Sequence, residues 1–161
     1  MSSLLYEPAP RHGHGAVEYN GKVYMWGGKD ESWNIYPATD VEIFDICTLL
    51  WERKPSSGTP PPAVVYNGYT RLGSSLYTFG GWKEVESKND IRCNSLHKLD
   101  LKTLVWKKLT PKNPSEGPSA KEGSVMIPLG KDKLIVFGGM TADSQYTNEL
   151  HVYSLNEGKL G

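Results

Sequence analysis

The sequence is poor in the features that mark secreted and membrane proteins. It has only 2 cysteines, Cys47 and Cys93. They fall at non-equivalent places, one in a predicted turn and one in a predicted loop, which indicates unpaired thiols in a reducing compartment rather than a disulfide. No apolar run reaches the ~18 residues of a membrane-spanning helix. Residues 1–6 lack the basic start and the long apolar run of a signal peptide.

An excess of charge of one sign is also missing. The 18 basic and 18 acidic residues balance to a net charge of +0, and no block of like charge stands out. Nucleic-acid binding usually requires a basic face, and the sequence offers none. A chain of 161 residues is long enough for one domain with a buried core. We therefore expect a soluble protein that binds neither nucleic acid nor membrane, located in the cytoplasm, with the nucleus as the alternative.

What the sequence does contain is a repeated stretch, in which an apolar run ends in two glycines. Each run has the length of a buried β-strand and is too short for a helix. Glycine lacks Cβ, so the pair allows a sharp backbone turn directly after the strand. The copies recur at spacings of ~50–60 residues, which is typical of repeat architectures. They are Val23–Gly28, Leu76–Gly81 and Leu134–Gly139.

A second strand follows each glycine pair after a polar loop. Apolar and polar residues alternate in these strands, as they do when one face is buried. The strands are Asp40–Asp45, Ser95–Asp100 and Glu149–Ser154. After a tight turn, a tryptophan stands at the same spacing in the first two units, as Trp51 and Trp106, whereas the third unit has Leu160 there. The repeating unit is therefore built of four strands, and the third copy lacks most of its last strand.

The double glycine, the aromatic or apolar residue that follows it and the spaced tryptophan resemble the kelch repeat. In that family each repeat forms one four-stranded blade of a β-propeller. The resemblance implies an all-β fold, a partial kelch propeller with three blades of four-stranded antiparallel sheet, the last one incomplete. Within a kelch-repeat domain of residues 1–161, we expect blades at about 11–54, 63–109 and 120–161. Trp51 and Trp106 should then pack between adjacent blades.

The first unit fits the family pattern best. Arg11–Val17 matches the Arg-x-Gly-His segment that opens many kelch repeats as the innermost strand, and Asn20-Gly21 predicts a tight hairpin. The other two units lack the arginine and the histidine, and Asn67 stands where the first unit has His14. The proline-rich residues 56–62 predict a break without a regular strand ladder.

Three blades are too few for a closed ring. Propellers typically close with ~4–8 blades, because each blade buries its faces only against its neighbours. The chain is therefore expected to be a piece of a six-bladed protein, to complete its ring with a second copy or another chain, or to form an open stack. Self-association through apolar blade faces is a consequence of the open ends.

No set of side chains in the sequence predicts catalysis. His12 and His14 alternate with glycines and have no third ligand nearby, so we assign no metal site. Glu42, His97 and His151 occupy equivalent strand positions, which predicts a solvent-facing position rather than a site. We expect neither enzyme activity nor a cofactor. Kelch-like propeller enzymes of the galactose oxidase type are the alternative that the resemblance leaves open.

The resemblance implies a protein–protein interaction module. Kelch propellers present inter-strand loops to protein or peptide partners, as ubiquitin-ligase substrate receptors or small-GTPase effectors do, and a structural scaffold is the further alternative. The corresponding loops here are Lys29–Thr39, Trp82–Asn94 and Met140–Thr147. Aromatic residues and arginine dominate binding hot spots. The candidate partner-binding residues are therefore Trp33, Tyr36, Trp82 and Arg92, of which Trp82 also suits a packing role directly after the glycine pair.

Overall fold

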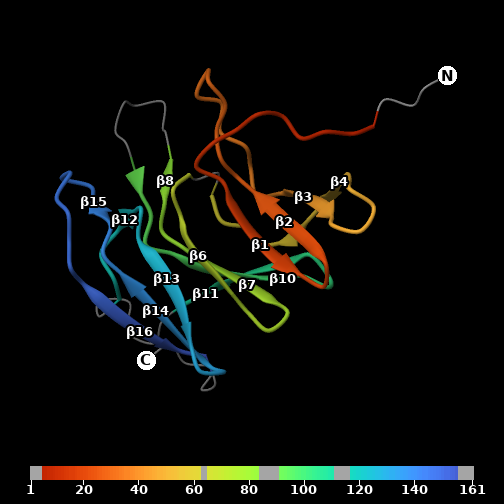
Figure 1. Ribbon diagram of the computed structural model, residues 1–161. Coiled ribbons are helices and arrows are strands. Elements are labelled where there is room, and N and C mark those ends of the chain that lie inside the picture. The colour runs from red at the N-terminus through yellow and green to blue at the C-terminus, as the bar shows by residue number, and fades with distance from the viewer. Residues whose placement is uncertain (1–4, 63–64, 84–90, 111–116, 156–161) are drawn as a thin grey trace.

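The computed structural model describes residues 5–62, 65–83, 91–110 and 117–155, and within these ranges every regular element is a β-strand. Three main sheets stand one after another, and each sheet is one blade (Figure 1). Blade 2 lies between the other two and packs against both. Among the described residues the arc of blades stays open. This is the all-β partial propeller that the kelch resemblance implies.

Blades 1 and 2 share one antiparallel order, in which the strand nearest the centre of the arc is the first in sequence. Blade 1 consists of β1 (Gly15–Tyr19), β2 (Lys22–Trp26), β3 (Asp40–Asp45) and β4 (Leu50–Pro55). Blade 2 consists of β6 (Gly68–Leu72), β7 (Ser75–Phe79), β10 (Leu96–Asp100) and β11 (Val105–Leu109). The predicted hairpin at Asn20-Gly21 is confirmed, and both residues have positive φ, 52° and 71°, as a two-residue hairpin turn requires.

Blade 3 has three described strands, β13 (Val125–Leu129), β14 (Lys133–Phe137) and β16 (Leu150–Ser154). Leu160, at the position of the spaced tryptophan, lies outside the described residues. Two small two-stranded sheets lie beyond the blade ends. One pairs β8 (Trp82–Lys83) with β9 (Ile91–Arg92), and the other pairs β12 (Lys121–Glu122) with β15 (Met140–Thr141).

The proline-rich residues 56–62 form more strand pairing than the sequence predicted. Ser57–Gly58 forms β5, which runs parallel to β11 and adds a fifth strand at the outer edge of blade 2. The pairing covers two residues only and stops before the prolines, which cannot donate a backbone hydrogen bond. Gly58 has φ +83°, and a Cβ there would meet the carbonyl oxygen of Trp106 at 2.2 Å. The close approach of the two backbones therefore depends on glycine at this position.

An apolar core joins blades 1 and 2. Trp106 is 1% exposed, and its indole Nε1 donates a 3.0 Å hydrogen bond to the carbonyl oxygen of Ala38 in blade 1. The Trp26 ring lies against Gly15, where a Cβ would approach to 2.1 Å. The predicted packing of Trp106 between blades is confirmed. The buried members of this core are Tyr24, Trp26, Ala38, Val41, Ile43, Leu76, Leu99, Leu101 and Trp106.

A second core joins blades 2 and 3 in the same way. Its buried members are Tyr77, Phe79, Leu96, Met126, Leu134, Val136 and Tyr153. The unbroken apolar character of the strand before each glycine pair predicts burial on both faces. This is confirmed for β7, in which all five residues are buried, and holds for the last three residues of β2. In β14, by contrast, buried residues alternate with exposed or partly buried ones. The difference arises because blade 2 has a neighbour on each side, whereas no described residue covers the outer face of blade 3.

Trp51 does not pack between two blades of the described chain. It lies half-buried on the outer face of blade 1, with its ring 5.0 Å from that of Phe44. Since Phe44 and Trp51 are direct cross-strand partners, as Leu99 and Trp106 are in blade 2, the two pairs are equivalent. The expectation was wrong because the blade that would cover Trp51 is not among the described residues.

The prediction of a solvent-facing position at Glu42 and His97 is also wrong. Both side chains are buried, with 2% exposure. Glu42 lies under the segment that precedes β1 and pairs with two arginines, while His97 faces blade 1 from β10. Alternation within a strand indicates which side chains share a face, but it does not show whether a second layer covers that face.

Both cysteines are free thiols, Cys47 exposed and Cys93 partly buried. Burial raises the pKa of the Cys93 thiol above its ordinary value. Within the described ranges, no helix has the length and apolar character needed to cross a membrane.

Candidate interaction surface at the rim

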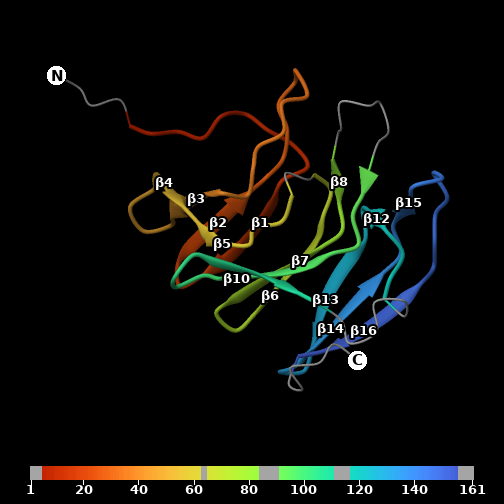
Figure 2. The ribbon, with the colours of Figure 1, turned by 180° about the vertical axis from the view of Figure 1, so that it is seen from behind.

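The three loops predicted to carry function reach the same edge of the arc, which we call the rim. In Figure 1 the loop after β2, the β8–β9 sheet and the β12–β15 sheet all lie along the upper edge. Figure 2 shows the same arrangement from behind. The hairpin turns at residues 20–21 and 73–74 point to the opposite edge (Figure 1). The repeat therefore places one loop of every unit on a common surface.

The glycine pairs direct the chain onto the rim. Their second residues, Gly28, Gly81 and Gly139, have φ of +86°, +98° and +105°, a region that side-chain-bearing residues rarely adopt. A Cβ at Gly81 would meet the carbonyl oxygen of Val65 at 2.9 Å. The residue after each pair then bonds to the segment that leads into its own blade, as the backbone pairs His12–Lys29 and Val65–Trp82 show.

A cluster of three aromatic rings surrounds the ammonium group of Lys29. Its Nζ lies 3.0 Å from the ring centre of Trp33, 5.1 Å from that of Trp82 and 5.6 Å from that of Tyr66. The rings of Trp33 and Trp82 meet edge to face with their centres 5.9 Å apart. Lys29 is 2% exposed, and a desolvated cation on an aromatic face contributes ~2 kcal/mol. This aromatic cluster (Lys29, Trp33, Tyr66, Trp82) joins the rim of blade 1 to that of blade 2 by noncovalent contacts.

Trp33 is held in place although it is exposed. Its φ is +67°, a conformation that costs a bulky residue of order 1 kcal/mol. The Asp30 carboxylate stabilises the turn by accepting 2.9 Å hydrogen bonds from the backbone N–H groups of Ser32 and Asn34. These bonds, with one from the Asn34 side chain as the largest contribution, lower the pKa of Asp30. The Trp33 ring remains 58% exposed, so the turn presents a large aromatic side chain in a fixed orientation.

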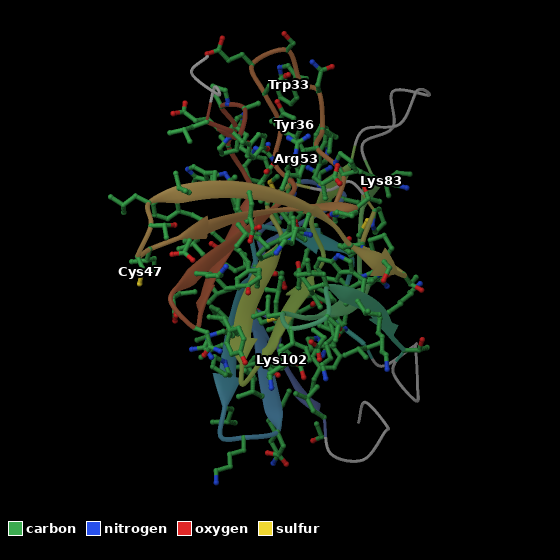
Figure 3. All side chains as sticks on the ribbon, turned by 90° about the vertical axis from the view of Figure 1, so that its right-hand side faces the viewer. Trp33, Tyr36, Cys47, Arg53, Lys83 and Lys102 are labelled. Carbon is green, nitrogen blue, oxygen red and sulfur yellow. The ribbon has the colours of Figure 1, made fainter. Side chains whose placement is uncertain are left out.

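Tyr36 belongs to a separate, charged part of the rim. The Arg11 guanidinium lies 3.9 Å from the centre of the Tyr36 ring and 3.2 Å from a carboxylate oxygen of Glu42. Arg53 binds the same carboxylate at 2.8 Å. Figure 3 shows Trp33 and Tyr36 on the protruding loop above blade 1, with Arg53 beneath them. Two arginines therefore compensate the buried Glu42, which explains why this acidic side chain can lie buried beneath the segment that precedes β1.

Arg92 connects the β8–β9 sheet to blade 3. Its Nη2 donates a 3.0 Å hydrogen bond to the Glu122 carboxylate, and the two side chains are 9% and 12% exposed. Nearby, Lys121 binds Glu149 at 2.7 Å, and this bond is the main reason why the pKa of Glu149 falls to about 2. Arg92 thus faces its own chain, and its ion pair with Glu122 links the rims of blades 2 and 3, while the Lys121–Glu149 pair lies within the rim of blade 3.

The structure brings two of the four predicted residues together. Trp33 and Trp82 share the aromatic cluster, with Trp82 only 7% exposed, whereas Tyr36 and Arg92 lie in separate ion-pair networks. Sequence reasoning missed Lys29 and Tyr66. Lys29 directly follows the first glycine pair, as Trp82 follows the second, so the repeat alignment could have indicated that they are rim neighbours. No sequence signal indicates Tyr66, which reaches the cluster through a positive φ of 57°.

Tyr66 also extends the aromatic surface toward the lead-in of blade 1. Its hydroxyl lies 3.4 Å from Nδ1 of His12, and the two ring centres are 6.1 Å apart. Among the described residues, no three His, Cys, Asp or Glu side chains gather in a way that could hold a metal ion. The described rim is thus a surface of aromatic rings and paired charges, suited to contact with a polypeptide.

The fold and this surface define a kelch-type propeller segment, a class of protein-interaction module. The KLHDC2/KLHL20/DRC7 Kelch-repeats domain matches residues 5–160, and the chain belongs to that family. It is 29% identical to human host cell factor 1 over 161 residues, 94% of this chain and 8% of that protein. It is 31% identical to bovine kelch domain-containing protein 3 over 133 residues, 82% of this chain and 32% of that protein. Bovine kelch domain-containing protein 2 is 27% identical over 143 residues, which are 89% of this chain and 32% of that protein.

Proposed function

We propose that this chain binds a protein or peptide partner at its rim, with Trp33 as the principal contact. The observation that carries the proposal is the combination of exposure and rigidity at Trp33. Its side chain is 58% exposed, and the Asp30 carboxylate holds its backbone turn. Its ring packs against the Trp82 ring and the Lys29 ammonium. Aromatic anchors that are fixed before binding lose little conformational entropy when a partner arrives. Tyr66 flanks the same Lys29 ammonium as Trp33, and together with the neighbouring His12 it offers polar atoms beside the cluster.

The resemblance supplies the candidate finer roles, and the geometry of the site favours one of them. The chain spans 8% of host cell factor 1 and 32% of the two kelch domain-containing relatives. A substrate-receptor role in a ubiquitin ligase and a small-GTPase effector role both require an exposed recognition surface of this kind. We favour the receptor, because a single anchored aromatic flanked by hydrogen-bonding groups suits a short peptide better than a broad globular face.

The test uses a random peptide library displayed on phage and selected on the folded 161-residue chain. Selected peptides are then measured by calorimetry against the wild type, Trp33→Ala and the control Leu49→Ala. Leu49 is a suitable control, since it is 69% exposed and also has positive φ, but lies in the turn between β3 and β4.

We expect Trp33→Ala to weaken binding by at least ~10-fold, the effect of a hot-spot residue, and Leu49→Ala to leave it unchanged. Circular dichroism must show that both variants keep the β-sheet signal. Peptides that bind wild type and Trp33→Ala equally, or a selection that yields no binder, would contradict the proposal.

A further inference from the structure

Three buried polar atoms at the interface of blades 1 and 2 have no hydrogen-bond partner among the described residues. They are Nε1 of Trp26, Oγ1 of Thr78 and Nδ1 of His97. The three residues are 2%, 1% and 2% exposed. A buried donor or acceptor without a partner costs free energy, and native proteins rarely contain one. Three such atoms at one interface therefore indicate a partner that the chain itself does not supply.

The strand register brings the three side chains to one place. Thr78 of β7 and His97 of β10 are direct cross-strand partners, and Thr78 is also paired with Tyr69 of β6. Cross-strand partners have their Cβ atoms about 5 Å apart. The Trp26 ring meets the Tyr69 ring edge to face, with the ring centres 5.3 Å apart. The indole of blade 1 therefore lies over the part of blade 2 that carries the hydroxyl and the imidazole.

The hydroxyl and the imidazole both face blade 1. Successive side chains of a strand point to opposite faces, so residues two apart share a face. Thr78 lies two residues after Leu76, and both of them belong to β7. His97 lies two residues before Leu99 in β10. Since Leu76 and Leu99 are members of the core that joins blades 1 and 2, as Trp26 is, all three polar side chains lie in the same inter-blade layer.

The interface between blades 2 and 3 differs at the same register positions. There a phenylalanine replaces the indole and a valine replaces the hydroxyl, while the third position is again a histidine, with Nε2 3.6 Å from a carboxylate oxygen of Glu149. At these positions, no buried polar atom of the described chain is without a partner. The indole and the hydroxyl thus occur together at one interface and are replaced together at the other, as expected of groups that bind one ligand. The residues equivalent to Trp26, Thr78 and His97 are Phe79, Val136 and His151.

We propose that a water molecule bound by Trp26, Thr78 and His97 is an integral part of the interface between blades 1 and 2. Buried waters typically make two to four hydrogen bonds to polar groups that have no other partner. The indole N–H only donates, whereas a hydroxyl and the Nδ1 of an imidazole donate or accept. Water has two donors and two acceptor positions, so it accepts from Trp26, donates to His97 and leaves a third hydrogen bond for Thr78.

The indole protons provide the test, with a matched control in the same core. Trp106 is as deeply buried as Trp26, and the two ring centres are 6.5 Å apart. Unlike Trp26, it donates its Nε1 proton to the carbonyl oxygen of Ala38. The ¹⁵N-labelled 161-residue chain is used, and the two indole signals are assigned with Trp26→Phe and Trp106→Phe. Cross-peaks between indole protons and water are then recorded in laboratory-frame and rotating-frame NOE experiments.

We expect a cross-peak between water and the Trp26 indole proton, with opposite signs in the two experiments. Opposite signs mark dipolar contact with a long-lived bound water, whereas proton exchange with solvent gives the same sign in both. The Trp106 indole proton should show no cross-peak to water. The proposal is overturned by the absence of a cross-peak at Trp26, by a cross-peak with the signs of exchange, or by equal cross-peaks at both tryptophans.

The variant Thr78→Val separates bound water from a relayed signal. A hydroxyl proton exchanges with solvent, so contact between the Thr78 hydroxyl and Trp26 can imitate a water cross-peak. Valine keeps the shape of the side chain, and Val136 shows that the repeat tolerates it at the equivalent position. We expect the Trp26 cross-peak to persist, because two partners still hold the water; its loss would overturn the proposal. If Thr78→Val does not fold, a wild-type crystal decides by the presence or absence of an ordered water within hydrogen-bond distance of Trp26 Nε1.

Discussion

Equivalent residues in successive blades have diverged into different chemical roles. Glu42, His97 and His151 occupy one register position, paired with Met25, Thr78 and Val136 on the neighbouring strand. Glu42 is compensated by two arginines, His151 is partly exposed near Glu149, and His97 is buried with its Nδ1 lacking a hydrogen-bond partner. A repeat therefore fixes the location of a side chain but not its charge or its partners.

The burial of His97 makes stability depend on pH. Desolvation, aided by repulsion from Lys108 across the strand pair, lowers the pKa of His97 from 6.5 to about 4. As the pH falls, His97 gains its proton near pH 6.5 in the unfolded chain but only near pH 4 in the folded chain. The free energy of unfolding therefore decreases as the pH falls from about 6.5 to about 4, and this contribution is constant below that range. A His97 pKa that is lowered from 6.5 to about 4 corresponds to a loss of about 3 kcal/mol in the free energy of unfolding across this pH range. Denaturation in urea at pH 7 and pH 4.5 should show this loss in wild type and a smaller one in the non-titrating variant His97→Gln. Equal losses in both would contradict the assignment.

At the scale of strands, the sequence predicted the regular parts of the fold and failed where tertiary contact decides. The apolar runs before the glycine pairs became β2, β7 and β14, because β-propensity and the turn after them are local properties. The pairing of β5 with β11 depends on two distant segments meeting, and no local pattern encodes it. The aromatic cluster is a similar case, since Trp33, Tyr66 and Trp82 meet only after two blades have stacked.

The two spaced tryptophans provide a matched test of blade stacking. Trp106→Ala removes a ring that is 1% exposed and breaks its hydrogen bond to Ala38, and we expect a loss of ~3–5 kcal/mol. Trp51→Ala removes an equivalent ring that is half-buried on an open face, and the loss should be well under half as large when measured on the monomer at low micromolar concentration. Chemical denaturation followed by circular dichroism measures both. Equal losses would mean that the outer face of blade 1 is already covered in the monomer.

The whole molecule is a stack in which stability comes from contacts between neighbouring blades. Blade 2 takes part in both apolar cores, whereas blades 1 and 3 each take part in one. In such arrays the free energy of unfolding is roughly a sum of the intrinsic stability of each unit and the terms for its interfaces. The rim adds a second set of links, the aromatic cluster between blades 1 and 2 and the Arg92–Glu122 pair between blades 2 and 3.

Unequal cover of the blades predicts unequal hydrogen exchange. The strands β7 and β14 are equivalent, both are five residues long, and each is hydrogen-bonded to a strand on both sides. They differ in cover, since all residues of β7 are buried whereas β14 has an exposed face. At 1 µM, exchange followed by mass spectrometry should be at least ~10-fold slower in β7, because its opening requires the loss of two apolar cores rather than one. Equal rates in the two strands at 1 µM would show instead that the three blades unfold as one cooperative unit.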